Sequence, residues 1–289
     1  MHAFLRSAAV VVLLEGMVCA VEPRVVKDLE YAKVGEHSLK LDLYVPAGAR
    51  SAPVVVWVHG GAWRSGSKKE TPLLPLTAKG FAVASVDYRL SPVAQFPAQI
   101  HDIKAAIRFL RAKAGEYGLG DRFAITGGSA GGHLAALMGV SNGVKELEGE
   151  VGEFREHSSD VQAIVSFYGP TNLTTILPQS TPHGLSVRVP ALELLLGGQP
   201  EVKTEVARLA SPVFHVDEND PPLLILHGDQ DLQVPINQSH ELVGAYAKHG
   251  LIAELDVVYG GAHGGKLFYT PSQLDRVANY LVSRLQSAK

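Results

Sequence analysis

Residues 127–132 read GGSAGG, and they decide which fold and chemistry the chain can support. They follow the apolar run 122–126 and precede residues 133–138, whose composition is typical of a helix. A glycine-flanked serine between a strand and a helix is the setting in which G-x-S-x-G forms a nucleophile elbow. The glycines are required because the strained turn brings other backbone segments close. The alternative is a glycine-rich loop that only turns the chain or cradles a phosphate.

In the elbow, Ser129 stands at the carboxyl end of a strand, above the N-terminus of the following helix. The dipole of that helix favours negative charge at this end. The backbone N–H of Ala130 then points to where a tetrahedral oxyanion forms. We therefore take Ser129 as the candidate nucleophile and Ala130 as one candidate oxyanion donor.

The composition is that of a globular protein. Hydrophobic residues make up 46% of the 289 positions and charged residues 19%, which supplies ample material for a core. The formal net charge of −3 provides no basic field to attract nucleic acid. Cys19 is the single cysteine, so no intramolecular disulfide can form.

Residues 1–20 are predicted to be a secretory signal peptide. Arg6 supplies the positive charge, residues 8–14 the apolar segment, and residues 18–20 a small-residue cleavage site. The apolar run is too short to span a bilayer. We expect a secreted or periplasmic protein without a membrane span. The alternative is a buried N-terminal helix, although Glu15 and Gly16 interrupt its apolar face.

Strands are predicted from two kinds of hydrophobic pattern. Alternation over residues 25–45 predicts an antiparallel hairpin with one side exposed to water. Continuous apolar runs predict further strands that are buried on both faces. These runs are residues 53–58, 81–86, 123–126, 161–167, 223–226 and 255–258.

Helices alternate with these strands. Apolar residues at spacings of three and four over 100–110 form one stripe, and residues 236–249 and 271–286 show similar patterns. The alternation predicts an α/β fold with an eight-stranded, mostly parallel sheet and helices on both faces, in one domain over 21–289. Residues 146–160 are predicted to form a surface excursion. Residues 171–210 are too long for a plain connection and are predicted to form a small cap or pocket wall.

A serine nucleophile needs a general base, and His263 is the candidate. It follows the apolar run 255–258, in a loop of small residues. Catalytic groups in open α/β sheets gather at the carboxyl ends of strands, which is where this loop lies. The alternative is an ordinary polar loop residue. The other histidines show no spacing typical of zinc ligands, so no metal site is expected.

A carboxylate should orient the base, and the loop at 227–235 presents two aspartates after a strand. The order along the chain would be serine, acid, histidine. Asp231 lies deeper in the loop, whereas Asp229 is placed to close its own turn. These features favour Asp231 without excluding Asp229.

The loop HGGAW at 59–63 follows another predicted strand and is the candidate second arm of an oxyanion hole. Small residues let backbone N–H groups approach a bound carbonyl, so Gly61 and Ala62 are the candidate donors. His59 is predicted to fix the loop. Trp63 is the candidate substrate-binding residue, with a packing role as the alternative.

Taken together, these motifs resemble the α/β-hydrolases of the esterase/lipase group, and most closely the feruloyl-esterase-like BD-FAE branch related to hormone-sensitive-lipase-like esterases. The matching segments run through most of the chain after residue 20. They are HGGAW at 59–63, DYRLSP at 87–92, FPA at 96–98 with Asp102, GGSAGGHLA at 127–135, FYGP at 167–170, HGDQDLQVP at 227–235 with Gln238 and Ser239, and GAHG at 261–264. Residues 176–200 match weakly.

The resemblance implies the α/β-hydrolase fold, with Ser129 as nucleophile, Asp231 as acid and His263 as base. It also implies a serine carboxylic-ester hydrolase that needs no cofactor and forms an acyl-enzyme, and the predicted signal peptide adds that this hydrolase is secreted. The expected partner is a short-chain, small-molecule ester or a polysaccharide-linked acetyl or feruloyl ester. The alternatives are an amide-directed hydrolase, such as an arylformamidase or peptidase, and a non-catalytic binding module. The sequence does not determine the oligomeric state.

Overall fold

The structure is a computed structural model that describes residues 22–285, so the predicted signal peptide and Cys19 lie outside the described residues. The strands are β1 (Arg24–Val34), β2 (His37–Val45), β3 (Ala52–Val58), β4 (Ala82–Val86), β5 (Leu119–Gly128), β6 (Ala163–Phe167), β7 (Leu223–Gly228) and β8 (Ala253–Val258). The α-helices are α1 (Ala98–Ala112), α2 (Ala114–Tyr117), α3 (Ala130–Gly139), α4 (Lys145–Glu148), α5 (Ile176–Gln179), α6 (Pro182–Leu196), α7 (Thr204–Leu209), α8 (Asn237–Lys248) and α9 (Pro271–Leu285). The 3-10 helices are η1 (Leu74–Lys79), η2 (Pro212–Phe214) and η3 (Lys266–Tyr269).

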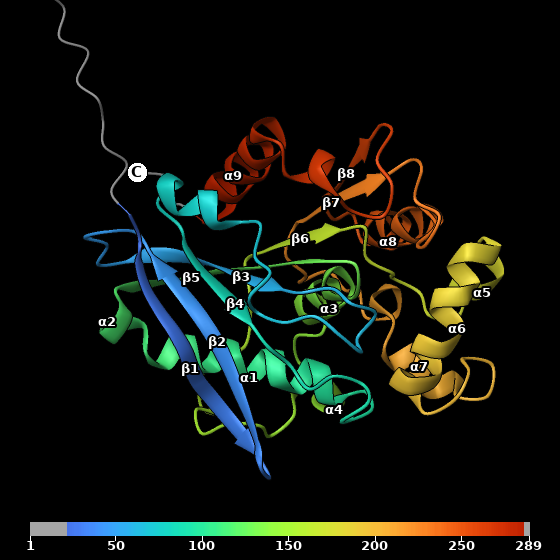
Figure 1. Cartoon of the computed structure of the whole chain (residues 1–289), viewed down its shortest axis with the longest axis horizontal. Coiled ribbons are helices and arrows are strands. Elements are labelled where there is room, and N and C mark those ends of the chain that lie inside the picture. Colours follow the sequence, from blue (N-terminus) through green and yellow to red (C-terminus); the bar gives the residue numbers. More distant parts are fainter. Residues whose placement is uncertain (1–21, 286–289) are drawn as a thin grey trace, which may run out of the picture.

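All strands of the described part form one eight-stranded sheet in the order β1-β2-β4-β3-β5-β6-β7-β8 (Figure 1). β2 is antiparallel to both β1 and β4, whereas every pair from β4-β3 to β7-β8 is parallel. The predicted leading hairpin and mostly parallel eight-stranded sheet are therefore confirmed. Because β3 to β8 point the same way, the loops that follow them gather at one edge.

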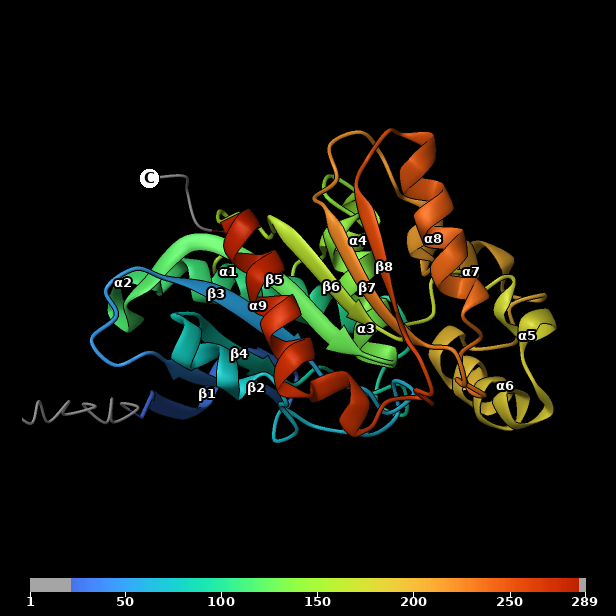
Figure 2. The same ribbon diagram turned by 90° about the horizontal axis from the view of Figure 1, so that it is seen from above.

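The central strands β3 to β7 are buried on both faces, as their continuous apolar runs require, whereas most of β1 is exposed. In β3, Val54, Val56 and Val58 pack into a core that also contains apolar residues of α1, α3 and α8. Val55 and Trp57 point the other way, into a core shared with α9. Figures 1 and 2 show α9 on one side of the sheet and α1 and α3 on the other.

The strand that leads to Ser129 is longer than predicted. β5 continues through Gly127 and Gly128, which pair with Ser166 and Phe167 of β6. The pattern did not reveal this extension because glycine contributes no hydrophobic side chain. The sheet therefore ends immediately before the serine, which fixes the position of the turn.

The predicted surface excursion at 146–160 is only partly at the surface. It follows the start of α4, and Leu147 is fully buried. Glu148 accepts hydrogen bonds from the buried cations Lys104 and Arg108 of α1. The charge pattern suggested a solvated loop, but this carboxylate instead satisfies two cations of the core.

Residues 171–210, predicted to form a cap or pocket wall, contain α5, α6 and α7. Figures 1 and 2 show these helices together beyond one end of the sheet. In α6, Leu192, Leu195 and Leu196 are buried, whereas Leu194 is 39% exposed. These buried leucines lie near the C-terminal end of α6 and attach the helix to the main core. The N-terminal part of α6 is thereby held near the carboxyl ends of the strands.

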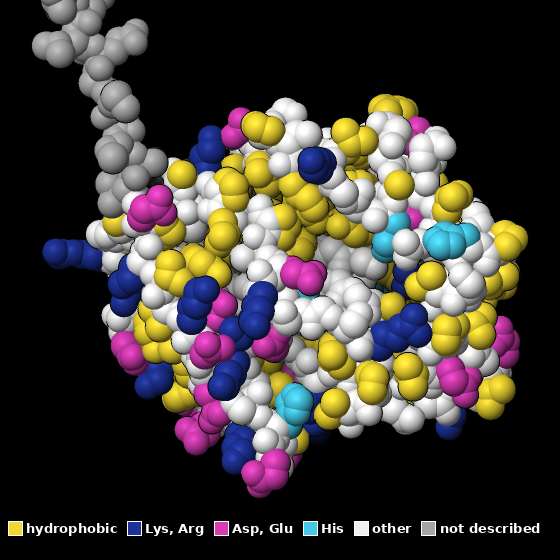
Figure 3. Space-filling model, in the orientation of Figure 1, with side chains coloured by type: hydrophobic (Ala, Val, Ile, Leu, Met, Phe, Trp, Pro, Cys, Tyr) yellow, Lys and Arg dark blue, Asp and Glu magenta, His cyan; other side chains and the backbone are white. Residues whose placement is uncertain are grey.

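No helix within residues 22–285 combines the length and apolar character needed to cross a bilayer. The face of the molecule seen in Figure 1 is hollowed near its middle (Figure 3). Hydrophobic, acidic, basic and histidine side chains surround this hollow.

Candidate active site

Ser129 occupies a strained turn between β5 and α3. Its backbone has φ +56° and ψ −118°, a left-handed conformation that a residue with a side chain seldom adopts. Its N–H donates to the carbonyl oxygen of Phe167 at 2.9 Å, which ties the turn to β6. Strain of this kind costs about 1–3 kcal/mol and persists where surrounding structure enforces it, commonly at functional sites.

The flanking glycines are needed for close packing, as predicted. A Cβ placed at Gly131 would overlap the carbonyl oxygen of Val58 in β3, and one at Gly127 would overlap that of Gly131. Gly60 is also close, because its Cβ would lie 2.9 Å from the carbonyl oxygen of Gly128 and 3.3 Å from the Cβ of Ser129. The backbone of the 59–63 loop is thereby brought against the serine.

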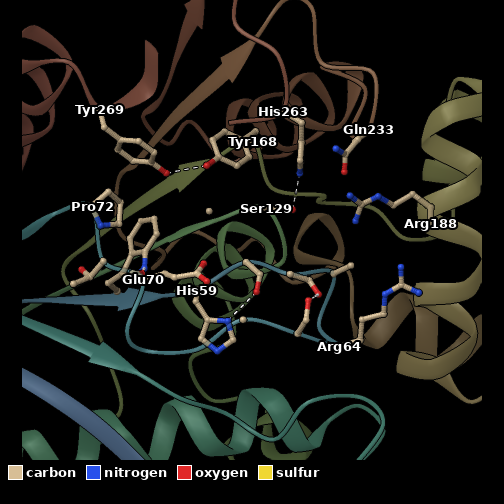
Figure 4. Close-up of a pocket in the computed structure, with 18 residues that line it drawn as sticks. His59, Arg64, Glu70, Pro72, Ser129, Tyr168, Arg188, Gln233, His263 and Tyr269 are labelled. Carbon is tan, nitrogen blue, oxygen red and sulfur yellow. Dashed lines mark hydrogen bonds between the residues drawn. The ribbon is translucent and has the colours of Figure 1, made fainter. Parts of the chain in front are cut away.

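The three predicted polar residues meet at the carboxyl edge of the sheet. Ser129 Oγ lies 2.7 Å from His263 Nε2, and His263 Nδ1 lies 2.7 Å from Asp231 Oδ2. The serine follows β5, Asp231 follows β7 and His263 follows β8. Residues separated by 134 positions therefore form one hydrogen-bonded series (Figure 4).

Asp231 is held by several donors. Its Oδ1 accepts from the N–H groups of Gln233 at 2.8 Å and Val234 at 2.9 Å, and the side chain is fully buried. Burial raises the pKa of the Asp231 carboxyl, but hydrogen bonds from His227 and His263 outweigh it and bring the pKa below its ordinary value. The carboxylate therefore stays ionised where it faces His263.

His227 is a supporting residue that the sequence interpretation did not single out. Its Nε2 lies 2.9 Å from the carbonyl oxygen of Val234 and 3.4 Å from Asp231 Oδ2, so this nitrogen is the donor. Its Nδ1 accepts from the hydroxyl of Ser239. The ring thus holds both the loop and the carboxylate.

Asp229 does not reach the imidazole. Its Oδ1 accepts from the N–H of Gly260 at 2.7 Å and so ties its loop to the one after β8. The expected bond within its own turn is therefore replaced by one to the neighbouring loop. Of the two aspartates, only Asp231 lies beside His263.

His263 is largely buried and carries an imidazole tuned to stay neutral. Burial lowers the pKa of His263, Asp231 raises it, and the positive charge of Arg188 lowers it again, with a net fall below the ordinary value. The ring of Tyr168 packs edge-on against the imidazole, with centroids 5.0 Å apart. The orientation of the imidazole is therefore fixed by packing as well as by hydrogen bonds.

The loop after β3 is also strained. Gly61, Ala62 and Trp63 have φ of +102°, +52° and +59° in succession. Within residues 22–285, the N–H groups of Gly61, Ala62 and Ala130 donate to no protein acceptor. Backbone donors without partners beside a serine hydroxyl are what an oxyanion hole requires.

Trp63 lies in the core and does not line the pocket, so the structure favours the packing alternative over the predicted substrate contact. The positive φ turns its side chain inward, where it is fully buried and does not line the pocket. Its indole N–H donates to Nδ1 of His133 at 3.0 Å, and Nε2 of His133 donates to the carbonyl oxygen of Ala210. Burial lowers the pKa of His133 to about 4, which keeps this bridging ring neutral.

His59 holds its loop, in agreement with its predicted role. Its Nδ1 donates to the carbonyl oxygen of Gly60 at 2.8 Å, and its ring stacks on Tyr88 with centroids 4.4 Å apart. The nearest carboxylate, Asp87, lies 4.0 Å from Nε2. These contacts hold the ring in its loop, and within residues 22–285 the imidazole that bonds to Ser129 is that of His263.

The pocket around Ser129 has a volume of about 740 Å³ and two different ends (Figure 4). One end is lined by the aromatic residues Trp57, Tyr168 and Tyr269, and the hydroxyls of the two tyrosines lie 2.8 Å apart. The other end is lined by Arg64 and Arg188. The sequence interpretation missed both ends.

No group of three or more His, Cys, Asp or Glu side chains in the described part of the chain is arranged to hold a metal ion. Of the histidines at the strand ends, His227 already uses both ring nitrogens in hydrogen bonds within the protein. His263 is likewise shared between Ser129 and Asp231. The polar groups of this site are thus arranged for proton transfer.

Comparison with known families agrees with this geometry. The family model described as BD-FAE matches residues 41–246. The chain belongs to the BD-FAE family. The match includes the loop at 59–63, Ser129 and Asp231, whereas His263 lies beyond it and is brought to the site by the fold.

Similar proteins carry the names of esterases. The probable carboxylic ester hydrolase LipM of Mycobacterium tuberculosis is 36% identical over 198 residues, which cover 67% of this chain and 44% of LipM. A solved structure described as a truncated carbohydrate esterase from gut microbiota is 31% identical, with a TM-score of 0.81 and coverage of 91% of this chain and 97% of that one. Thermogutta terrifontis esterase 2 phosphonylated by sarin is 28% identical, with a TM-score of 0.76 and coverage of 91% and 96%.

These comparisons confirm the predicted α/β-hydrolase fold and the resemblance to BD-FAE-type esterases. The chain spans about half the length of the curated relatives it matches, with shares of 44%, 48% and 53% for LipM, LipC and LipQ of Mycobacterium tuberculosis. The match to the solved esterases covers nearly the whole of both chains.

Proposed function

We propose that the protein is a serine carboxylic-ester hydrolase with Ser129, His263 and Asp231 as its catalytic triad. The observation that carries this proposal is the pair of 2.7 Å contacts that join hydroxyl, imidazole and carboxylate. Three side chains from distant parts of the sequence lie within the hydrogen-bond reach that nucleophilic catalysis requires. The BD-FAE match and the esterase neighbours support the same reaction class.

In the proposed reaction, Ser129 Oγ attacks the ester carbonyl carbon while its proton passes to His263 Nε2. The carbon–oxygen bond to the alcohol then breaks, and the alcohol leaves with the proton from His263. Water then attacks the acyl carbon as His263 takes its proton; the bond from that carbon to Ser129 Oγ breaks, Oγ recovers the proton from His263, and the carboxylic acid leaves. Asp231 keeps the imidazole in the tautomer with hydrogen on Nδ1 and stabilises the imidazolium that forms.

The oxyanion of each tetrahedral intermediate is proposed to bind the N–H groups of Gly61, Ala62 and Ala130. All three are free of protein acceptors within residues 22–285, and Gly60 brings their loop against Ser129. Removing one such donor typically raises a reaction barrier by about 3–4 kcal/mol. The strained backbone at Ala62 is consistent with a loop shaped for this purpose.

The substrate class is proposed to be short-chain esters or acetyl and feruloyl esters linked to carbohydrate. The pocket of about 740 Å³ is large enough for a sugar or an aryl ring. Trp57, Tyr168 and Tyr269 offer flat surfaces on which such a ring can pack. A solved neighbour that carries the name of a carbohydrate esterase supports this class.

The proposed reaction is tested by covalent labelling. A fluorophosphonate probe should label the wild type and a Ser272→Ala control, whose exposed serine lies outside the pocket. The Ser129→Ala variant should remain unlabelled and hydrolyse no ester. Labelling of the Ser129→Ala variant at another residue of the pocket would contradict the assignment of the nucleophile.

The substrate class is tested by a hydrolysis panel. We expect p-nitrophenyl acetate, acetylated xylan or methyl ferulate to be cleaved faster than p-nitrophenyl palmitate. Aminoacyl amides and formylkynurenine are included, because faster cleavage of either would favour the amide-directed alternative. A preference for the palmitate ester would refute a short-chain or carbohydrate-linked substrate.

Export is a separate proposal that rests on residues 1–20 of the sequence. We propose a secreted or periplasmic enzyme, cleaved after the small residues at 18–20. N-terminal sequencing of protein recovered outside the cytoplasm should begin near Val21. Recovery of the intact N-terminus from the cytoplasmic fraction alone would contradict export.

A further inference from the structure

Arg188 of α6 is an unusual residue because it is buried without a counter-charge bonded to it. Its side chain is 1% exposed. Within residues 22–285, its Nε and Nη1 have no hydrogen-bond partner. Its guanidinium carbon lies 5.9 Å from the ring centroid of Trp63, so an aromatic ring is its neighbour on one side.

Other buried or largely buried cations within residues 22–285 are paired. Arg89 binds the Asp102 carboxylate through several hydrogen bonds, including 2.8 Å from Nε and 2.6 Å from Nη2. Lys104 and Arg108 both bind Glu148. Burying a cation without such a partner is unfavourable, so a lone guanidinium in a fold that pairs its others calls for a ligand.

The position of Arg188 indicates where that ligand would lie. Arg188 lines the pocket, and Figure 4 shows its guanidinium directed toward Ser129. Arg64 and Gln233 lie on the same side of the pocket, whereas Glu70 lies toward the aromatic end. Positive charge and hydrogen-bond donors are therefore concentrated at one end of the site.

We propose that Arg188, assisted by Arg64, binds a carboxylate carried by the ester substrate. This inference rests on the proposed esterase function and narrows its substrate class to anionic esters. A guanidinium presents parallel donors that match both oxygens of a carboxylate, and such charge-assisted bonds are strong where water is excluded. The aromatic end would receive the uncharged remainder of the substrate.

The charge of Arg188 also bears on the chemistry at His263. This cation lowers the pKa of the neighbouring imidazole and so opposes the imidazolium that must form during acylation. A substrate carboxylate bound to Arg188 neutralises that charge. An anionic ester thus contributes its own negative charge at the step where positive charge develops on His263, and a neutral ester does not.

The carboxylate can stand on the acyl side or on the alcohol side of the ester, and Arg188 would bind it in the same way. Matched pairs of esters distinguish the two positions. Monoethyl succinate carries the carboxylate on the acyl side, and ethyl levulinate is its neutral counterpart of similar shape. Acetoxyacetate carries it on the alcohol side, and acetoxyacetamide is the neutral counterpart. Proton release at constant pH gives kcat/KM for all four without a chromophore.

The wild type should prefer the anionic member of one pair. In an Arg188→Gln variant, the ratio of anionic to neutral kcat/KM for that pair should fall about 10- to 100-fold, the usual effect of losing hydrogen bonds to a charged group. Arg188→Lys should give a smaller fall, because an ammonium lacks the parallel donors. Arg50→Gln, at an exposed position outside the pocket, is the matched control and should keep the ratio.

Equal losses for anionic and neutral esters in both Arg188 variants would overturn the proposal and assign Arg188 to general support of the site. Wild-type kcat/KM for both members of each pair in both variants would overturn it as well. If Arg188→Gln fails to fold, as judged by its thermal unfolding, Arg188→Lys provides the same comparison.

A binding measurement separates this proposal from the esterase function. In the Ser129→Ala background, calorimetric titration should show tighter binding of the preferred anionic ester than of its neutral counterpart, and Arg188→Gln should remove the difference. Binding without turnover by the wild type would refute the esterase function and leave the carboxylate site intact. Turnover of neutral esters with no difference in binding would refute the carboxylate site alone.

Discussion

On the sheet side of the pocket, Ser129, His263 and Asp231 are each joined to a partner within the protein. On the helical side, Arg188 of α6 points into the same pocket with two nitrogens that have no partner in the described residues. The first region is complete before any substrate arrives. In the second region the guanidinium is not bonded to a carboxylate of the described residues, and we propose that a substrate carboxylate binds there.

This difference teaches which property each region controls. Groups that move protons must be held in place beforehand, and the strand ends and glycine contacts do this for Ser129. A group that selects a substrate contributes most to binding when its hydrogen-bond donors have no partner in the free protein. Changes on the sheet side should therefore affect all esters alike, whereas changes in α6 should affect some esters more than others.

Asp231→Asn is expected to have the largest effect. The amide would favour the wrong tautomer of His263 and could not stabilise the imidazolium, so kcat should fall about 10⁴-fold for anionic and neutral esters alike. Steady-state kinetics on the ester pairs would measure this. A loss confined to one class of ester would contradict the division between the two regions.

Asp229→Asn is the matched control for that substitution. Asp229 lies in the same loop, but its Oδ1 bonds the N–H of Gly260 and not the imidazole. An asparagine oxygen can accept the same hydrogen bond, so kcat should stay close to that of the wild type. A comparable loss in both variants would show that the loop and not the Asp231 charge is responsible.

Gly131→Ala should be next in size, because the new methyl group would overlap the carbonyl oxygen of Val58. We expect a loss of about 3 kcal/mol or more in the free energy of unfolding. Urea denaturation would measure it. Gly115→Ala in α2 is the control, since no atom lies within 4 Å of its new Cβ and alanine suits a helix. Equal stability of the two variants would contradict the close packing described for the elbow.

Trp63→Phe tests the packing role of Trp63. It would leave Nδ1 of the buried His133 without a donor, so the free energy of unfolding should fall by about 1–2 kcal/mol. Trp57→Phe is the counterpart: it also loses an indole hydrogen bond, to the carbonyl oxygen of Glu70, but Trp57 lines the aromatic end of the pocket, so KM should rise as well. A raised KM without loss of stability in Trp63→Phe would restore its role in substrate binding.

The smallest expected effect is a shift in pH dependence. Because burial and the charge of Arg188 lower the pKa of His263, against the opposing effect of Asp231, the wild type should keep kcat/KM to pH values below 6.5. Removing the cation in Arg188→Gln raises the pKa of His263, so the acid limb should move to higher pH. A shift to lower pH in a neutral-ester profile would contradict the proximity of these two groups.

The sheet side could be predicted from the sequence because its signals are local. A glycine-flanked serine after an apolar strand, and polar residues just after two later strands, are fixed by fold geometry to one edge. The choice between Asp231 and Asp229 as the catalytic carboxylate is harder. The two residues lie two positions apart in one loop, and the sequence does not show which side chain faces His263. The contact between Asp231 and the imidazole identifies Asp231 as the partner of His263.

The helical side could not be predicted in the same way. Thr181-Pro182 and Gly197 are ordinary signals for the start and end of a helix, but Pro190 interrupts the pattern between them. Arg188 lies four residues from both Gly184 and Leu192 on the buried stripe of α6, a signal that could have identified it. The buried position of Trp63 could not be predicted, because the positive φ that turns it inward is invisible in the sequence.

The glycine packing around Ser129 has a consequence for how this enzyme could diverge. Even one added carbon at Gly127 or Gly131 collides with neighbouring main chain, so those positions admit no gradual change. In α6, Val189 and Leu194 are 40% and 39% exposed and tolerate replacement more easily. Selection for a new substrate would therefore accumulate mutations in the helix at 182–196 while the serine turn stays unaltered. Saturation mutagenesis of both segments should yield few active variants at the serine turn and many in α6.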